Sequence, residues 1–590
     1  MPPDLFGFCA ALLRWSGVYS YYNPGAEPLD GSPYIFSLAS DELKSARSVG
    51  IEWAECGDWG DDGANTRGLA LAGEPPKIIL EWWKELLSYS SHRIIFKVTK
   101  DDEVPRWCQL LILMTVAADE ASFGIGRFAP ETAKVEGKFV SWADLILEIN
   151  QIEEAEEPIK DTNQSPTIDS GHLHKLVPRE QTIATSLNKE VACVQPKSRT
   201  SPVGCTLRAL SQNLALLPHR GELRVHCLKP ASDRLSDPNQ ASLNLVLIPY
   251  PFNISTDDFE VTEDPVGEGT DNRWGWFHIN QRWLPHTKSV LSKFIEFVDA
   301  ILAKAAAEHD IIHGLVFPEY SLDWSTYQSL TDHIAKNHHS IELFVAGASN
   351  NCEGDEGNFV LNATFMDNAD RSSEKPRDVI ITSRAKHHRW CLEKHQIASY
   401  GWEEAFDPID MVRWEKISLP PRQIHTHLFR EGSTYSTLIC EDLARSEPCH
   451  EALRAVGPNL LFVLLMDGPQ ITSRWSCRYA TGMAEDPGSS VLTFTSRALV
   501  EAANSTRDTS THNWAIGLWK DPLNPSPVPI ECAPGSQAAF LKLTGGRVSE
   551  ASLDNRIQPG CWIWAIKEKS VAQIDISGTH SELVNEFVDN

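Results

Sequence analysis

The sequence predicts an α/β protein in which a mainly helical N-terminal domain precedes a larger domain of layered sheets and helices. Within residues 1–150 the periodic apolar segments have helical spacing, and within 151–200 aromatic residues and periodicity fade. From residue 243 onward, short β-branched apolar runs alternate with amphipathic segments. We therefore expect a helical domain over 1–150, a flexible acidic and polar linker over 151–200, and an α/β domain over 201–590.

The composition is typical of a globular protein with reduced cysteines and disfavours a nucleic-acid-binding protein. A chain of 590 residues with 42% hydrophobic residues can bury a sizeable core. A net charge of −27 disfavours binding to nucleic acid. The 13 scattered cysteines predict reduced thiols. The apolar run near the N-terminus lacks the preceding basic residues of a signal peptide, so we predict a cytoplasmic protein without a membrane anchor.

The N-terminal part contains three helix signals. Residues 77–87 and 105–119 have helical periodicity, the second with Pro105 at its start. Ser141 is placed to cap a third helix, and the apolar stretch from Val203 predicts a helix that docks on the following domain.

The C-terminal part reads as alternating elements. Helices are predicted over 288–309, 324–337, 450–456 and 471–485. Strands are predicted over 243–250, 341–348, 358–366, 459–466, 490–495, 515–519, 537–543 and 561–566.

Three polar residues each follow a strand-like run. Glu319 follows the apolar run from residue 311, Lys386 follows a strand that starts at residue 379, and Cys440 ends the run Thr437-Leu438-Ile439. A nearby ammonium lowers the pKa of a thiol, and a nearby carboxylate can accept its proton. The trio therefore indicates nucleophilic catalysis by a cysteine, whereas Cys440 alone would more often be a small buried apolar residue.

The order Phe-Pro-Glu, Lys, Ile-Cys-x-Asp resembles the nitrilase superfamily, the carbon–nitrogen hydrolases. The resemblance covers residues 243–566. It implies a four-layer α-β-β-α sandwich, with Glu319 as general base and Cys440 as nucleophile. Lys386 and the backbone N–H of Glu441 would stabilise the oxyanion.

Two assignments stay open at this point. Family members often carry a second glutamate soon after the lysine, and Glu393 occupies such a place in KHHRWCLE, although it can equally be a solvated helix residue. Lys394 is a rival to Lys386, with Glu403 or Glu404 as its second acid. We prefer Lys386 because it ends a strand, and an insertion over 405–422 would explain the long spacing to Cys440.

Further residues are candidates for the substrate pocket. Positions just after the cysteine and after the following strand line the pocket mouth in the nitrilase fold, which points to Glu441, Arg445, Met466 and Asp467 as substrate contacts. The spacing of His387, His388, His395, His425 and His427 fits no helix-borne pair of ligands, so no metal and no cofactor are expected in the site.

Two functions compete. The first is hydrolysis of a non-peptide amide or nitrile through an acyl-enzyme, in a homo-oligomer built on a dimer. The second is a nitrilase-fold sensor or assembly module of a bacterial antiviral defence complex, with a protein partner bound through the N-terminal domain. The presence of Glu319, Lys386 and Cys440 together favours the enzyme.

Overall fold

The computed structural model describes most of the chain. The described residues are 1–23, 36–58, 75–92, 104–123, 139–141, 173–175, 182–230 apart from 185, 189, 201–203 and 220–222, 241–262, 274–366, 377–407, and 412–589 apart from 431 and 568. The helix expected after Ser141 and residues 151–172 of the expected linker lie outside them. Among the described helices, none has the length and apolarity that a membrane span requires.

Two eight-stranded sheets form the centre of the molecule. The first sheet has the order β13-β12-β11-β10-β7-β22-β23, with β24 also paired to β22. Its strands are β7 (Ser242–Leu247), β10 (Gly314–Val316), β11 (Leu343–Asn350), β12 (Glu356–Phe365), β13 (Val379–Ala385), β22 (Ala538–Ala551), β23 (Ile557–Ala565) and β24 (Val571–Ile574). Strands β7, β10 and β11 are parallel. Strand β12 runs antiparallel to β11, and β13 runs antiparallel to β12 and thus in the same direction as β10.

The second sheet has the order β21-β20-β19-β18-β17-β16-β6-β3. Its strands are β3 (Leu173–Lys175), β6 (Arg224–Pro230), β16 (Gln423–Arg430), β17 (Ser433–Ile439), β18 (Leu460–Leu465), β19 (Ser490–Thr495), β20 (Ala515–Lys520) and β21 (Val528–Glu531). The parallel strands β17, β18 and β19 are buried along their whole length. Both of their faces are therefore covered, as their unbroken apolar sequences require.

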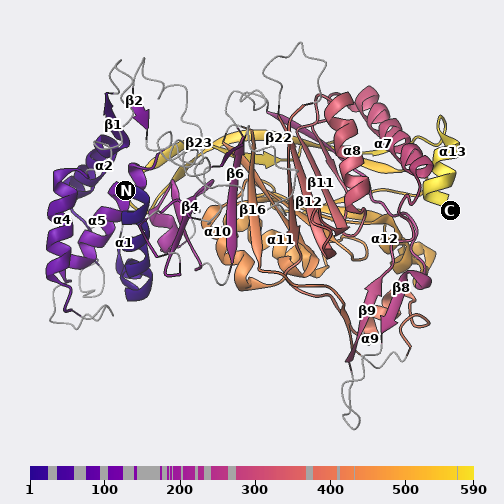
Figure 1. Cartoon of the computed structure of the whole chain (residues 1–590), viewed down its shortest axis with the longest axis horizontal. Coiled ribbons are helices and arrows are strands. Elements are labelled where there is room, and N and C mark those ends of the chain that lie inside the picture. The colour runs from indigo at the N-terminus through magenta and orange to yellow at the C-terminus, as the bar shows by residue number, and fades with distance from the viewer. Residues whose placement is uncertain are drawn as a thin grey trace, which may run out of the picture.

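Helices cover the outer face of each sheet (Figure 1). Helices α7 (Lys288–His309) and α8 (Trp324–Asn337) pack on the first sheet, where Phe294 and Leu330 share a core with Phe344. Helices α10 (Glu451–Val456), α11 (Trp475–Glu485) and α12 (Arg497–Ser505) pack on the second. The predicted four-layer α-β-β-α arrangement is confirmed.

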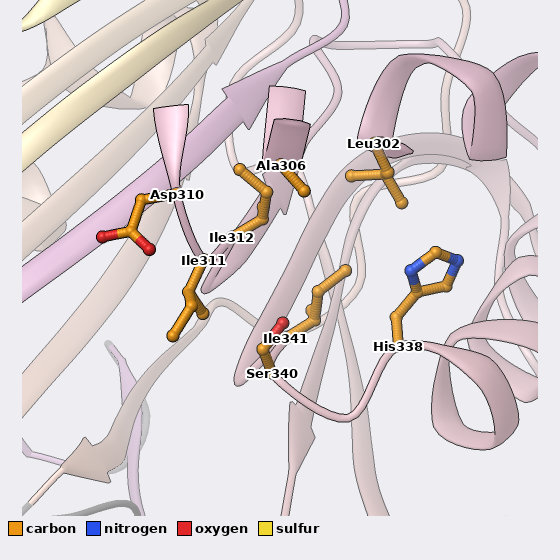
Figure 2. A pocket seen from close by; sticks show the side chains of 8 residues that line it. All are labelled: Leu302, Ala306, Asp310, Ile311, Ile312, His338, Ser340 and Ile341. Atoms are coloured by element: carbon orange, nitrogen blue, oxygen red, sulfur yellow. The ribbon is translucent and has the colours of Figure 1, made fainter. Parts of the chain in front are cut away.

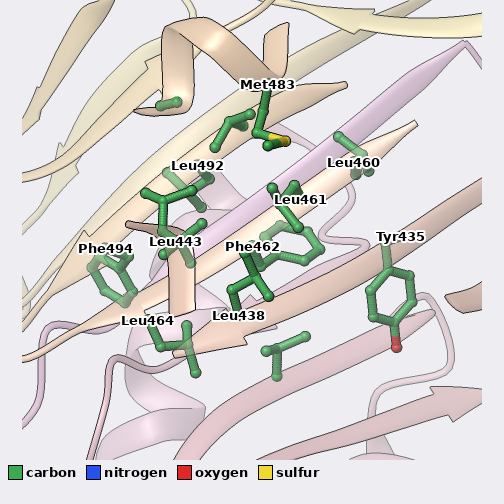
Figure 3. Packing of buried hydrophobic residues seen from close by; sticks show 14 of the residues in the cluster. Tyr435, Leu438, Leu443, Leu460, Leu461, Phe462, Leu464, Met483, Leu492 and Phe494 are labelled. Atoms are coloured by element: carbon green, nitrogen blue, oxygen red, sulfur yellow. The ribbon is translucent and has the colours of Figure 1, made fainter. Parts of the chain in front are cut away.

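The core between the sheets is continuous. Leu245 and Val345 of the first sheet belong to the same buried cluster as Leu438 and Phe462 of the second. Figure 3 shows how this cluster extends from Tyr435 across β18 to the helix that carries Met483. Burial of a large apolar side chain contributes about 1.5–3 kcal/mol, so this core fixes how the sheets face each other.

A small four-stranded sheet, which sequence reasoning did not foresee, extends from the sandwich (Figure 1). It consists of β8 (Phe259–Thr262), β9 (Trp274–Ile279), β14 (Cys391–Leu392) and β15 (Val412–Glu415), with α9 (Lys394–Tyr400) beside it. Aromatic rings form its core, among them Phe259, Phe277, Trp390, Trp402 and Phe406. The expected insertion over 405–422 thus contributes a strand, β15, to an ordered subdomain.

The N-terminal part is mainly helical, as predicted. Its helices are α1 (Pro2–Ser16), α2 (Ser40–Ala54), α4 (Lys77–Ser88) and α5 (Arg106–Glu120). Helix α5 is buried along almost its whole length and contacts the other three. Trp82 and Trp107 are buried in this core.

Two expectations for residues 182–217 are corrected. Instead of a linker that ends at residue 200, the chain forms a hairpin of β4 (Cys193–Pro196) and β5 (Leu214–Leu217), and the polar residues that follow β4 are buried. The helix expected from Val203 is only a short 3₁₀ turn over Leu207–Leu210. The reason is that the run Leu214–Leu217 pairs its backbone with β4, and this tertiary pairing overrides helix propensity.

A buried polar network attaches the helical part to the sandwich. Asp119, near the end of α5, accepts hydrogen bonds from the backbone N–H groups of Gln212 (2.7 Å), Asn213 (3.0 Å) and Leu214 (2.9 Å). The guanidinium of Arg556, which follows the turn before β23, donates to the same carboxylate over 2.8 Å. Because unpairing buried charges is costly, the network holds the two parts in one arrangement.

Candidate active site

Three strand ends bring the predicted site residues together. Glu319 follows β10, Lys386 follows β13 and Cys440 follows β17, so the first two come from one sheet and the third from the other. Their exposed fractions are 2%, 1% and 3%. The site is therefore enclosed where the ends of the facing sheets meet.

Lys386 lies between two buried carboxylates. Its Nζ donates to Oε1 of Glu319 over 2.9 Å and to Oε2 of Glu415 over 2.7 Å. Burial alone would lower the pKa of Lys386, but the two negative charges outweigh it and hold the pKa well above its ordinary value. Lys386 is therefore a permanent cation, and one of its three N–H bonds remains for another acceptor.

Sequence reasoning missed Glu415 and Asn358. The Nδ2 of Asn358 donates to Oε1 of Glu319 (2.7 Å) and to Oε1 of Glu415 (2.8 Å). Glu415 also accepts from the Tyr320 hydroxyl (2.9 Å) and from the backbone N–H of Trp390 (2.8 Å). Both oxygens of Glu415 are engaged by these donors and by Lys386, so Glu415 positions the lysine.

Glu319 retains one unengaged oxygen. Its Oε2 is buried without a hydrogen-bond partner among the described residues. Burial raises the pKa of Glu319; Lys386 opposes this rise and Glu415 adds to it. A carboxylate with a raised pKa and a free oxygen is suited to accept a proton.

The backbone around Glu319 is tightly constrained. A Cβ at Gly347 of β11 would lie 2.5 Å from the Cα of Glu319, so only glycine allows this approach. The next residue, Tyr320, has a φ of 58°, in the left-handed region that non-glycine residues rarely adopt. Such strain persists only where surrounding packing imposes it, and it fixes the direction of Glu319.

Cys440 is at a sharp change of backbone direction. It has a φ of 41° and begins the 3₁₀ helix Cys440–Leu443 directly after β17. Burial and then the charge of Glu319 raise the pKa of the Cys440 thiol well above its ordinary value, although Lys386 lowers it. The nearby ammonium thus lowers the pKa of the thiol, as predicted, but burial outweighs its effect.

A second buried cluster joins the lysine segment to the cysteine segment. Asp442 accepts from the backbone N–H of His387 (3.0 Å) and from Nη1 of Arg384 (3.0 Å). Burial alone would raise the pKa of Asp442, but His387, His388 and Arg384 hold it well below its usual range. This cluster fixes Lys386 relative to Cys440, since it ties the residues on either side of the lysine to the turn that follows the cysteine.

Glu393 and Lys394 lie elsewhere. Glu393 caps the N-terminus of α9, its side chain is 58% exposed, and it lies 3.3 Å from His395. Lys394 is exposed as the first residue of the same helix. The assignment of Glu393 as the second acid is thus corrected, because β14 directs the chain away from Lys386 and β15 brings Glu415 back to it.

The four proposed substrate contacts differ in position. Glu441 and Arg445 form an ion pair of 2.8 Å in which Arg445 is 54% exposed, so Arg445 faces solvent. Met466 is buried in the aromatic cluster of the small sheet. Asp467 is buried, accepts from the Tyr400 hydroxyl over 2.8 Å, and its charge contributes to the raised pKa of Cys440. Asp467 therefore lies within electrostatic reach of the thiol.

Comparison with known proteins found similarity to solved structures. The chain is similar over its C-terminal part to solved carbon–nitrogen hydrolases of the nitrilase superfamily. No family model matches the sequence. No curated protein matches it either.

Three solved structures illustrate the similarity. Nit3 of Saccharomyces cerevisiae, a member of branch 10 of the superfamily, is 11% identical, with a TM-score of 0.26, over 59% of this chain and 95% of that chain. A CN-hydrolase superfamily protein of Xanthomonas campestris, with an arsenic adduct in its active site, is 10% identical, with a TM-score of 0.25, over 59% and 97%. A carbon–nitrogen hydrolase of Helicobacter pylori is 9% identical, with a TM-score of 0.26, over 58% and 92%.

Proposed function

We propose that this protein is a cysteine-dependent hydrolase of a C–N bond in a small amide or nitrile. The observation that carries the proposal is that three strand ends bring together Cys440, Glu319 and Lys386 in a buried site. Oε2 of Glu319 has no partner among the described residues, and Lys386 bonds the other oxygen of Glu319 over 2.9 Å. These are a nucleophile, a base and an oxyanion stabiliser in one enclosed site.

For an amide, acylation begins with transfer of the Cys440 proton to Oε2 of Glu319 as the sulfur attacks the carbonyl carbon. The S–C bond forms while the C=O electron pair moves onto oxygen, where the remaining N–H of Lys386 and the backbone N–H of Glu441 stabilise it. Because the raised pKa of the thiol disfavours a separate thiolate, proton transfer accompanies the attack in this proposal.

Collapse of this intermediate breaks the C–N bond. The protonated Glu319 gives its proton to the leaving nitrogen, and the acyl group stays on Cys440 as a thioester. Water then attacks the thioester, Glu319 accepts a proton from the water, and the sulfur leaves as the thiol. Glu415 does not exchange a proton in these steps; its role is to position Lys386.

The enclosure of the site favours small substrates. Cys440 is 3% exposed, and a folded protein substrate could not bring a peptide bond to it without opening the junction of the two sheets. Glu319 and Lys386 are equally buried. A substrate that enters this space is also shielded from water, which strengthens the electrostatic effect of Lys386.

Intact-mass spectrometry tests the proposal. The full chain is incubated with a panel of small amides and nitriles, and an acyl adduct is sought together with the released amine or ammonia. The adduct should be absent in Cys440→Ala and present in Cys391→Ala, a matched control because Cys391 is half-buried nearby but begins β14. Turnover that survives Cys440→Ala would contradict the proposal. An unmodified Cys440 across the whole panel would also contradict it, and would favour the sensor or assembly role.

A further inference from the structure

A carboxylate and two imidazoles meet between α7 and α8, away from the candidate active site. Asp299 of α7 lies 2.8 Å from Nε2 of His333 in α8 and 2.7 Å from Nε2 of His338, which follows α8. One ligand atom from each residue lies within 4.8 Å of those of the other two. Three groups that bind cations thus converge from two helices and a loop.

This cluster lies at the amino ends of the parallel strands of the first sheet, opposite to the end where Glu319 lies. Strands β10 and β11 are parallel, and Glu319 follows the carboxyl end of β10. His338 precedes the amino end of β11, which begins at Leu343. The full length of these strands therefore separates the cluster from Glu319, and the proposed hydrolysis makes no use of it.

We propose that Asp299, His333 and His338 form a binding site for a divalent transition-metal ion, with Zn²⁺ as the ion that the ligands fit best. Imidazole nitrogen and carboxylate oxygen are the ligands that Zn²⁺ takes in open sites, with three protein ligands and a water. The two N···O separations are hydrogen-bond lengths, so only modest movements are needed for the three atoms to surround an ion.

Metal binding replaces two protons. In the present arrangement each Nε2 is placed to donate its hydrogen to Asp299, whereas a metal-bound Nε2 carries none and the hydrogen is on Nδ1. Asn337 Nδ2 lies 3.1 Å from Nδ1 of His333. A half-turn of this amide places its oxygen there to accept Nδ1–H, so Asn337 is a ready outer partner for the bound form.

The site is accessible and partly preorganised. The side chains of Asp299, His333 and His338 are 37%, 26% and 24% exposed. His338 also lines a cavity of about 300 Å³ with Leu302 and Ile341 (Figure 2). A fourth ligand such as water can reach the ion from solvent or from this cavity.

The loop that carries His338 is anchored. The Arg377 guanidinium donates to the backbone carbonyl of His338 over 2.8 Å and to that of Ile341 over 2.8 Å. Fixing the loop backbone reduces the ordering that metal binding would require. A bound ion would in turn link α7 to α8 and stabilise the outer helical layer of the first sheet.

Calorimetric titration of Zn²⁺ into the chelator-treated full chain tests the proposal. The wild type should bind one more equivalent than the double variant His333→Gln/His338→Gln. His339→Gln, in an exposed neighbouring residue, should behave as the wild type. Asn337→Ala should weaken binding about 10- to 100-fold. Equal stoichiometry and affinity in the wild type and the double variant would overturn the proposal.

A second measurement does not depend on how well the variants fold. Co²⁺ added to the wild type should give the visible d–d absorption of a low-coordinate site, without the thiolate-to-cobalt charge-transfer band that cysteine ligands produce. Zn²⁺ should also raise the midpoint of thermal unfolding in the wild type and in His339→Gln. If no d–d band appears, or if it comes only with a charge-transfer band, the site does not exist.

Discussion

Replacement of Lys386 by methionine should impair both stability and turnover, for separable reasons. The substitution keeps an apolar chain of similar length but removes the charge that bonds Glu319 over 2.9 Å and Glu415 over 2.7 Å. Two buried carboxylates then face each other without a cation, which should cost about 3–5 kcal/mol in the free energy of unfolding. Loss of an oxyanion stabiliser should lower kcat by about 10²- to 10³-fold.

The stability loss should depend on pH in a defined direction. Without the ammonium, which opposes the rise, the folded-state pKa of Glu319 moves further above its unfolded value. A group with a raised folded pKa favours the folded state below the unfolded pKa and loses this contribution as pH rises through the folded pKa. The difference in unfolding free energy between wild type and Lys386→Met should therefore be largest at neutral pH and shrink in acid.

Denaturant titrations at neutral and acidic pH provide the assay. Lys394→Met on the exposed start of α9 is the matched control and should change stability by less than about 0.5 kcal/mol. Adding Glu415→Gln to Lys386→Met should recover stability, because one buried charge is removed, but it should not recover turnover. The reasoning is refuted if Lys386→Met unfolds like the wild type, or if Lys394→Met abolishes turnover instead.

Three further predictions concern the glycine beside Glu319, the thiol of Cys440 and the assembly of the chain. Gly347→Ala should displace Glu319 and lower the free energy of unfolding by about 1–3 kcal/mol in a denaturant titration. Gly546→Ala, which has open space around it, should be tolerated. Equal effects of the two substitutions would argue against the close approach of Gly347 to Glu319. Iodoacetamide should label the exposed Cys205 before Cys440 at neutral pH, because burial raises the pKa of the Cys440 thiol. For the same reason, labelling of Cys440 in the free protein should still increase above pH 9. Peptide mapping that finds Cys440 labelled first would contradict the raised pKa. Light scattering at micromolar protein should give the mass of a dimer or a multiple of it, and a monomer would contradict the expected assembly.

Much of the sandwich was predictable because its signals are local. The runs over β18 and β19 are continuous and apolar, which only strands buried on both faces require. Helix α7 has the predicted bounds because its apolar residues repeat at helical spacing and Thr287 caps its N-terminus. The hairpin within residues 182–217 is not predictable in this way, because the pairing of β4 with β5 is a tertiary contact that no local pattern contains.

The candidate active site likewise combines residues that local signals predict with residues that only tertiary contacts bring there. That Glu319, Lys386 and Cys440 each follow a strand could be read from the residues, and the carboxyl ends of strands that run in the same direction lie together whatever the intervening loops do. The second acid depends on tertiary folding, because Glu415 reaches Lys386 from 29 residues away through a strand of a separate sheet, while the nearer Glu393 is exposed. The raised pKa of Cys440 also depends on tertiary folding, because burial and nearby charges set it and the enclosing layers come from segments distant in sequence.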